Sequence, residues 1–205
     1  MIVVDHPLVH VHVTIIRDQD TGVDQFRHHL TQLARLLAFP VLQDLACEAV
    51  TVSTPMAETT GCRLAYEPIL VPVLRAGLGL VDGFRDLIPG SIVSHLGMYR
   101  DHRTLKPIRY YSNFPENRQN HPFVLLDPML ATGGSAVDAL NFLKEEGARQ
   151  IRLVSIIAAP EGVRQVETLH PDVPVYTAAL DDHLDDRGYI VPGLGDAGDR
   201  QFGTL

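Results

Sequence analysis

The sequence predicts an α/β fold, with a central and mostly parallel sheet flanked by helices. From Glu67 onward, short apolar runs of strand length alternate with segments of helical periodicity, and this alternation is typical of parallel βαβ units. The runs are predominantly apolar, as expected of strands that are covered on both faces. A chain of 205 residues fits a single domain.

The elements of this core, expected over residues 67–182, follow from local signals. Strands are predicted where apolar runs lie between turn residues, at 69–74, 91–98, 123–126, 151–158 and 173–178. A helix that includes Val81 and Leu87 follows the first strand, and a helix over residues 135–146 follows the third. Pro160 suits the first turn of the next helix.

The residues before the core, 1–66, are predicted to form a helical appendage. Over residues 23–39 the apolar side chains recur at helical spacing, at Phe26, Leu30, Leu33 and Leu37. Thr21 and Asp24 fit a capping box at the start of this helix. Pro40 interrupts the pattern, and residues 41–50 are a candidate second helix.

Composition and charge exclude several classes of protein. The chain is 45% hydrophobic and 20% charged, which allows an ordinary globular core. Its net charge of −8 argues against a generic binder of nucleic acid or of anionic membranes. The N-terminus lacks the pattern of a secretory leader, so we expect a soluble cytoplasmic protein.

The cysteines and histidines do not predict a metal site. Cys47 and Cys62 are the only cysteines and belong to no CxxC motif, a usage that suits a reducing compartment. His6, His10 and His12 alternate along what the sequence suggests is a strand. They lack a further ligand at metal-binding spacing, and we interpret them as ordinary surface or core residues.

Two stretches depart from the alternation of strands and helices. Residues 99–122 are polar, interrupted by proline and rich in Arg and Tyr, and an insertion of this length is more often a functional arm than filler. Within it, residues 101–118 form a basic arm with Arg103, Lys106, Arg109 and Arg118, although a solvated charged loop explains these charges equally well. Residues 183–205 are rich in glycine and are expected to cap the edge of the sheet.

The stretch LLDPMLATGGSA, residues 125–136, carries the main functional prediction. Asp127 ends a buried strand, and the chain then turns into a helix start, which exposes backbone N–H groups to an anion. Gly133 and Gly134 let an oxyanion approach the backbone closely, and Thr132 and Ser135 add hydroxyl donors. The pattern fits a ribose 5-phosphate, although TGG alone is equally consistent with a simple tight turn.

The motif DPMLATGGS resembles the phosphoribosyl-diphosphate (PRPP) signature of type I phosphoribosyltransferases, in the form found in the uracil phosphoribosyltransferase family. HPLV and TIIRD within residues 6–18, VPVLRAGLGLVDGF at 71–84 and GYIVPGLGDAGDRQFGT at 188–204 resemble the same family. Most type I relatives carry two adjacent acids where this chain has Asp127-Pro128, and the single acid matches the uracil branch. The resemblance implies a type I fold with a protruding arm and a base-binding hood over residues 183–205.

The resemblance also implies a reaction, pyrimidine salvage, in which uracil and PRPP give UMP and diphosphate with Mg²⁺ as cofactor, bound mainly through PRPP and without dedicated protein ligands. Asp127, Arg75 and Asp196 would be the catalytic residues. Arg75 and Arg100 would bind the diphosphate, and the Arg75–Ala76 peptide is expected to be cis. The PRPP-binding set would be Arg75, Arg100, Asp127, Pro128, Met129, Leu130, Ala131, Thr132, Gly133, Gly134, Ser135 and Asp196.

The hood would read the base. Ile190, Gly195, Asp196 and Ala197 match the uracil-binding positions of the family, while Tyr189 is equally consistent with a role near the base and with a place in the core. The resemblance further implies homodimers or higher homo-oligomers and a possible GTP effector, whose site the sequence does not locate.

Two other functions compete with this reading. One phosphoribosyltransferase branch contains regulators that bind RNA, but the acidic balance of this chain and the lack of a concentrated basic face speak against that function. A transferase acting on a purine or on orotate would keep the same chemistry. The tail GYIVPGLGDAGDR argues against it, because purine enzymes carry different hoods.

Overall fold

The computed structural model describes residues 1–100 and 107–204, with the backbone alone for residues 98–100 and 107–110. Within these residues the main sheet has nine strands. Across it lie β1 (Ile2–Val3), β11 (Val175–Leu180), β10 (Ile151–Ala158), β8 (Phe123–Leu126), β4 (Ile69–Leu74), β6 (Leu96–Arg100) and β7 (Pro107–Tyr111), with β5 (Ile92–Val93) beside β4 and β9 (Met129–Leu130) beside β10. Among the described strand pairs of this main sheet, only β6 and β7 run antiparallel. The predicted α/β class is confirmed.

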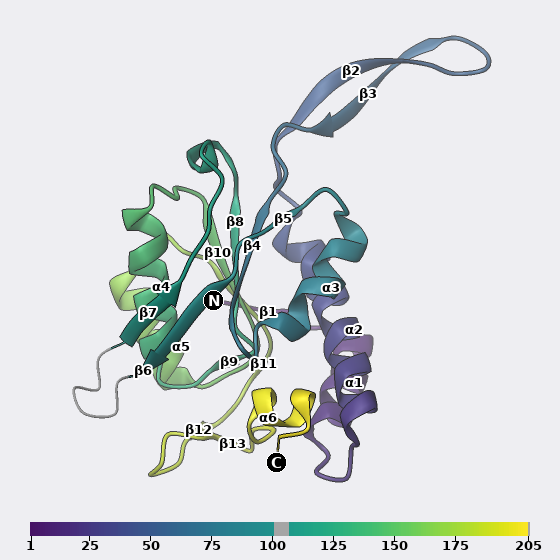
Figure 1. Ribbon diagram of the computed structural model, residues 1–205. Coiled ribbons are helices and arrows are strands. Elements are labelled where there is room, and N and C mark those ends of the chain that lie inside the picture. The colour runs from purple at the N-terminus through teal and green to yellow at the C-terminus, as the bar shows by residue number, and fades with distance from the viewer. Residues whose placement is uncertain (101–106, 205) are drawn as a thin grey trace.

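Helices cover both faces of this sheet (Figure 1). α1 (Pro7–Arg17), α2 (Val23–Val41) and α3 (Leu78–Leu87) lie on one face, and α4 (Gly134–Glu145) and α5 (Pro160–Leu169) on the other. The central strand β8 shows why its sequence is apolar throughout: Val124 and Leu126 pack in one core cluster, while Phe123 and Leu125 pack in the other. Both faces of β8 are therefore buried.

The predicted strands 69–74, 123–126 and 151–158 match β4, β8 and β10 residue for residue. The single strand expected over residues 91–98 is instead divided into β5 and β6. The break lies beside Pro72 of β4. Two residues earlier on the same strand, the Leu70 carbonyl accepts a hydrogen bond from the Ser94 N–H at 2.9 Å. Because Pro72 has no N–H to donate on the same side of β4, the ladder is interrupted there.

The expected strand through the N-terminal histidines is wrong, because these residues lie at the start of and within α1. His6 caps this helix, its Nδ1 accepting from the Leu8 N–H at 3.1 Å, and Pro7 occupies the first helical position. The capping box expected at α2 is also absent. Gly22 is the N-cap residue, and the Thr21 hydroxyl donates instead to the Ile15 carbonyl at 2.6 Å.

The candidate second helix over residues 41–50 is wrong as well. α2 includes Pro40 in its last turn and ends one residue later at Val41, which is fully buried. A proline so close to the C-terminus removes one helical hydrogen bond only. The chain then forms the antiparallel hairpin of β2 (Cys47–Ser53) and β3 (Glu58–Leu64), which projects from the body as a long two-stranded ribbon (Figure 1).

The chain ends beyond the carboxyl edge of the sheet with β12 (His183–Leu184), β13 (Ile190–Val191) and α6 (Ala197–Phe202). α6 contacts α2, so the C-terminal segment touches the N-terminal helices. The Val191–Pro192 peptide is cis. No helix in residues 1–100 and 107–204 combines the length and hydropathy required of a membrane span.

Of the predicted arm over residues 99–122, the structure describes β7 and the short 3₁₀ helix Arg118–Asn120. Arg103 and Lys106, and the side chains of Arg100 and Arg109, lie outside the described part of the chain. Arg118 is not a free basic residue, because its guanidinium donates to the Glu146 carboxylate and to the Glu146 carbonyl, both at 2.8 Å. It therefore fixes the chain against the end of α4.

Candidate active site

Two of the predicted residues follow neighbouring strands at the same edge of the sheet. Asp127 comes directly after β8, and Arg75 comes directly after β4. The two strands are parallel, with Leu70 opposite Val124 and Pro72 opposite Leu126. Ligands of open parallel sheets bind at the carboxyl ends of the strands, and both residues lie at that edge.

Residues 127–135, which we call the phosphate cradle, form the strand–turn–helix that the sequence predicts. β9 returns the chain briefly to the sheet beside β10, and Gly133 then takes a left-handed conformation with φ 86° to open α4 at Gly134. The first N–H groups of α4 have no partner within the helix. A small cavity of about 80 Å³ is lined by Asp127, Met129, Leu130, Ala131, Thr132, Gly133, Ser135 and Ala136.

Two predicted members of the cradle, Pro128 and Gly134, support its backbone without lining a cavity. Pro128 lines neither this cavity nor the larger one described below. Its carbonyl accepts the N–H groups of Ile156 and Ile157 at 3.0 and 3.1 Å, which ties the cradle to β10. Gly134 also lines neither cavity and supplies the first residue of α4.

The Asp127 carboxyl group is held in an environment that disfavours its charge. Burial raises the pKa of Asp127 from 3.8 to about 6, and the Met129 N–H, which donates to its Oδ1 at 3.3 Å, opposes that rise only in part. Within the part of the chain that the structure describes, this carboxylate has no ion-pair partner and accepts one hydrogen bond, from Met129. A ligand that offers hydroxyl groups would satisfy it.

The larger cavity joins the cradle to the C-terminal segment. It has a volume of about 260 Å³. Its walls come from Asp127, Met129 and Ala131 on one side and from the predicted base-reading residues on the other, the full lining being Ala76, Asp127, Met129, Ala131, Gly188, Tyr189, Ile190, Gly195, Asp196, Ala197 and Gly198. The structure thus brings together two groups of residues that are about sixty positions apart in the sequence.

Asp196 belongs to this lining and also caps α6. Its Oδ1 accepts the Asp199 N–H at 2.9 Å, which satisfies one of the free N–H groups at the start of the helix. The carboxylate is therefore oriented by α6 at the wall of the cavity.

Arg75 lies beside the cavity, and its neighbour Ala76 lines it. The guanidinium is 59% exposed and forms an ion pair with Asp199 of α6 at 3.2 Å, while its carbon lies 5.9 Å from the centre of the Phe202 ring. The cis peptide of this loop is Leu74–Arg75, so the expectation of a cis Arg75–Ala76 bond is wrong by one residue.

Several lining residues were not predicted from the sequence. Ala76, Gly188 and Gly198 complete the cavity, and Tyr189 lines it with 52% of its surface exposed, which excludes the core reading of this tyrosine. Gly162 of α5 lies directly behind the cradle, where a Cβ atom would stand 2.3 Å from the Ala131 carbonyl oxygen. Its only sequence signal is a glycine in the first turn of a helix.

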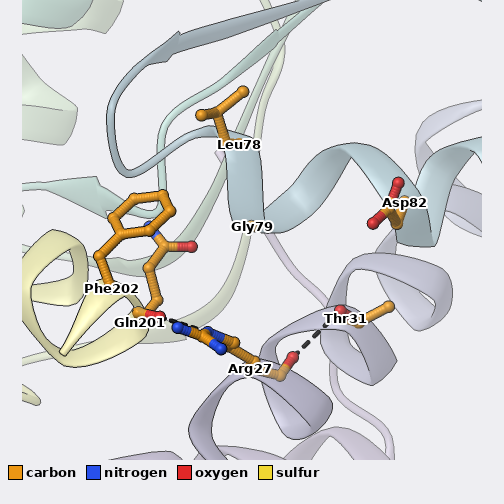
Figure 2. A pocket seen from close by; sticks show the side chains of 7 residues that line it. All are labelled: Arg27, Thr31, Leu78, Gly79, Asp82, Gln201 and Phe202. Carbon is orange, nitrogen blue, oxygen red and sulfur yellow. Dashed lines mark hydrogen bonds between the residues drawn. The ribbon is translucent and has the colours of Figure 1, made fainter. Parts of the chain in front are cut away.

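A third cavity lies between α2, α3 and α6. Figure 2 shows its lining, made of Arg27, Thr31, Leu78, Gly79, Asp82, Gln201 and Phe202. The Arg27 Nε donates to the Gln201 carbonyl, and the Gln201 amide in turn donates to the Ala76 carbonyl at 2.8 Å. Gln201 therefore connects this cavity to the loop that carries Arg75.

The histidines of α1 take part in no metal cluster within the described residues. There, no group of three or more His, Cys, Asp or Glu side chains is placed to hold a metal ion. His12 Nδ1 lies 2.7 Å from His29 Nδ1 on α2, and burial lowers the pKa of both imidazoles. His10 pairs with Asp5 at 3.1 Å at the surface.

Comparison with known proteins identifies the family. A profile of the uracil phosphoribosyltransferase family matches residues 3–204. The chain belongs to this family. It is 52% identical to the uracil phosphoribosyltransferase of Bacillus thuringiensis (strain Al Hakam) over 203 residues, which cover 98% of this chain and 97% of that protein. The resemblance seen in the sequence is thus confirmed.

Two solved structures place the fold. The AQ2163 protein from Aquifex aeolicus superimposes with a TM-score of 0.92 at 37% identity, covering 98% of this chain and 97% of that one. Adenine phosphoribosyltransferase from Trypanosoma brucei, solved with AMP, pyrophosphate and ribose-5-phosphate, gives a TM-score of 0.58 at 13% identity, covering 94% of this chain and 85% of that one. The fold is therefore that of the type I phosphoribosyltransferases.

Proposed function

We propose that the protein transfers the phosphoribosyl group of PRPP to N1 of uracil, forming UMP and releasing diphosphate. The observation that carries this proposal is the cavity shared by the cradle and the hood residues Ile190, Gly195 and Ala197. It adjoins the smaller cavity of the cradle, with which it shares Asp127, Met129 and Ala131. One continuous site could hold the phosphate, the ribose and the base in that order.

The cradle supports binding of the ribose 5-phosphate. The first N–H groups of α4 and the hydroxyls of Thr132 and Ser135 would receive the phosphate, which the helix N-terminus favours. Asp127 would accept hydrogen bonds from the ribose hydroxyls. Its raised pKa fits this assignment, because such donors would stabilise a carboxylate that accepts only one hydrogen bond from the described residues.

Arg75 would bind the diphosphate. Its guanidinium is exposed at the carboxyl edge of β4, one strand from Asp127, and its planar fork suits two diphosphate oxygens. Arg100 remains the proposed second arginine, on the family resemblance alone.

The hood would recognise uracil through its backbone. Ile190, Gly195 and Ala197 line the cavity, and backbone donors and acceptors in fixed positions suit a small planar base. Cytosine replaces an acceptor by a donor at C4, so it would leave buried groups unpaired, and discrimination on this basis can reach about 10⁴-fold.

In the reaction, the bond between C1 of the ribose and the diphosphate breaks as the bond from C1 to uracil N1 forms. Arg75 stabilises the charge that develops on the leaving diphosphate. The cradle and the hood hold C1 and N1 in line and exclude water. Asp196, oriented by its bond to the Asp199 N–H, is the candidate acceptor for the N1 proton.

Mg²⁺ fits this site as an ion held chiefly by PRPP. Asp127 and Asp196 are two carboxylates of the lining, and within the described residues no three acidic or histidine side chains are grouped to chelate a metal. The two carboxylates would hold waters of an ion that keeps most of its hydration shell. When bound, Mg²⁺ neutralises negative charge on the diphosphate.

We also propose a homo-oligomer, at least a homodimer. The β2–β3 hairpin leaves the body (Figure 1) and exposes Val52 and Met56, the latter at 92%. A two-stranded hairpin is marginally stable alone in water, and a second copy of the chain would cover it. Sedimentation of the wild type and of a chain shortened across residues 49–62 would test this, since only the former should sediment above the monomer mass.

A GTP effector and a cytoplasmic location complete the proposal. The third cavity, between α2, α3 and α6, supports an effector because it is separate from the substrate cavity and presents Arg27 to an anion. The exposed free thiols of Cys47 and Cys62 suit a reducing compartment. Turnover measured with and without GTP tests the first point, and an unchanged rate at every PRPP concentration would count against it.

The decisive experiment supplies PRPP and Mg²⁺ with uracil, cytosine, orotate, hypoxanthine or adenine and follows diphosphate release. We expect substantial turnover with uracil alone. Turnover with orotate or a purine in its place would contradict the proposal. RNA retention that falls with salt, in a protein without turnover, would instead indicate a regulator.

A further inference from the structure

The base-reading turn of the hood is supported from behind by two arginines that line neither substrate cavity. Residues 193–195 form no backbone-to-backbone hydrogen bond outside the regular elements in the described part of the chain. They lie between β13 and α6, which contribute Ile190 and Ala197 to the cavity. Hydrogen bonds from side chains therefore hold this turn in place.

The first support comes from the end of α1. Arg17 Nη1 donates to the Gly193 carbonyl at 2.8 Å and to Asp181 Oδ2 at 2.9 Å, and its Nη2 donates to Asp181 Oδ1. The same carboxylate accepts the Gly193 N–H at 2.9 Å. Both polar groups of the Gly193 backbone are thus held by one ion pair, whose Asp181 side chain is 3% exposed.

Gly193 transmits this contact to the cavity. It has φ 64°, and a Cβ atom would stand 2.1 Å from the Ile190 carbonyl oxygen. The two backbones are therefore packed against each other with no room between them. A displacement of Gly193 would displace Ile190, which lines the cavity.

The second support is Arg200, which is 9% exposed. Its guanidinium donates to the Leu194 carbonyl at 2.7 Å, to the Asp18 carbonyl at 2.6 Å and to the Ile16 carbonyl. It also lies over the Phe26 ring, 4.5 Å from the centroid. The carbonyls at the end of α1 carry partial negative charge and lack helical partners, so Arg200 joins that helix end to the turn.

We propose that the Arg17–Asp181 pair and Arg200 are positioning residues for uracil, which hold residues 193–195 so that the hood backbone matches the base. The proposal rests on the proposed function and deepens it. The arginines contact the backbone of the turn, whereas the cradle, which would hold the ribose 5-phosphate of PRPP, is fixed separately by β9, β10 and Gly162. Their loss affects the uracil side of the reaction selectively.

The test compares Arg17→Lys and Arg200→Lys with Arg35→Lys. Arg35 makes the same kind of arginine–carboxylate contact, with Asp86 across α2 and α3, away from the cavity. Lysine keeps the positive charge but cannot bind several acceptors in a fixed fork. We expect the KM for uracil to rise about 10- to 100-fold in the first two variants, with the KM for PRPP within about two-fold of wild type, since small misplacements have effects of this size.

The control Arg35→Lys should leave both constants unchanged. Circular dichroism at the assay temperature identifies any variant that is partly unfolded, and Arg17→Lys serves if Arg200→Lys does not fold. Equal rises in both KM values, or no rise in the KM for uracil, would overturn the positioning role while leaving the proposed function intact. A wild-type protein without uracil turnover would instead overturn both.

Discussion

The two walls of the proposed substrate cavity are built in opposite ways. The phosphate cradle is nine consecutive residues, 127–135, held by the sheet beneath it and by a helix packed behind it. The base-reading turn belongs to no strand of the main sheet and is held by Arg17, Asp181 and Arg200. Arg17 and Asp181, which form an ion pair, are 164 positions apart in the sequence. Backbone packing fixes one wall, and buried side-chain charge fixes the other.

This difference suggests a division of tasks. A phosphate requires a fixed set of N–H groups, which a strand–turn–helix supplies from local sequence. A base requires a surface whose donors and acceptors match one molecule among several similar ones. A turn held by side chains can be adjusted to a base without disturbing the sheet.

The largest expected effect tests the single charge of the cradle. Asp127→Asn should lower turnover about 10³-fold, because the amide cannot accept hydrogen bonds from the ribose hydroxyls as a carboxylate does. The same change should increase the free energy of unfolding by about 1–2 kcal/mol at pH 8, since it removes a partly buried charge that is stabilised by only one hydrogen bond from the described residues. Steady-state kinetics and urea denaturation provide the two measurements.

The gain in stability expected of Asp127→Asn depends on pH because the pKa of Asp127 is raised in the folded state. Below about pH 3, Asp127 is protonated in both the folded and the unfolded states, so the charge has no cost. Between the unfolded value of 3.8 and the folded value of about 6, the folded state retains a proton that the unfolded state releases, and stability falls as pH rises. The advantage of Asn should therefore be absent at about pH 3 and complete above about pH 7. A constant advantage would contradict the assigned pKa.

A smaller effect tests the packing behind the cradle. Alanine usually stabilises a helix relative to glycine by about 1 kcal/mol, yet a Cβ atom on Gly162 would lie 2.3 Å from the Ala131 carbonyl oxygen. Gly162→Ala should therefore push the cradle into the cavity and raise the KM for PRPP about 10- to 50-fold, with the KM for uracil unchanged.

Gly22→Ala is the matched control, because a Cβ atom there meets nothing within 4 Å. If Gly162→Ala behaves like this control, the cradle does not depend on α5. If it raises both KM values together, the two walls are not held independently.

The smallest expected effect lies where the two walls meet, at the ion pair of Arg75 with Asp199. Asp199→Asn should tighten binding of inorganic diphosphate about two- to five-fold, since it removes a competitor for the Arg75 guanidinium, and exposed ion pairs contribute little. Calorimetry in low salt measures this. Asp86→Asn removes the same charge elsewhere, and equal tightening in that variant would indicate only a change of net charge.

The contrast also explains what the sequence could predict. β4, β8 and β10 were predicted to the residue because they are buried on both faces and bounded by turn residues. The cradle was predicted as a unit because its chemistry is contiguous. The supports of the hood were missed, since no local pattern in DRQF or TIIRD reveals that Arg200 reaches the carbonyls of Ile16 and Asp18.

The wrong predictions have local physical causes. Residues 41–50 contain leucines at helical spacing, but the β-branched run around Val50 and Val52 pairs instead with residues 58–64 in the hairpin. The alternation of His10 and His12 suggested a strand, and the stronger signal was His6-Pro7, a cap followed by proline at the first helical position. In the second case the boundary residues were more informative than the periodicity.

The bond between Arg200 and Ile16 spans 184 positions, and this separation has a consequence for biosynthesis. Domains begin to fold while the ribosome is still translating them, with N-terminal segments first. The sheet and the cradle can form from residues made before Arg200, but the end of α1 gains its arginine partner only once α6 has been translated. We therefore expect the base-reading turn to reach its final conformation after the cradle.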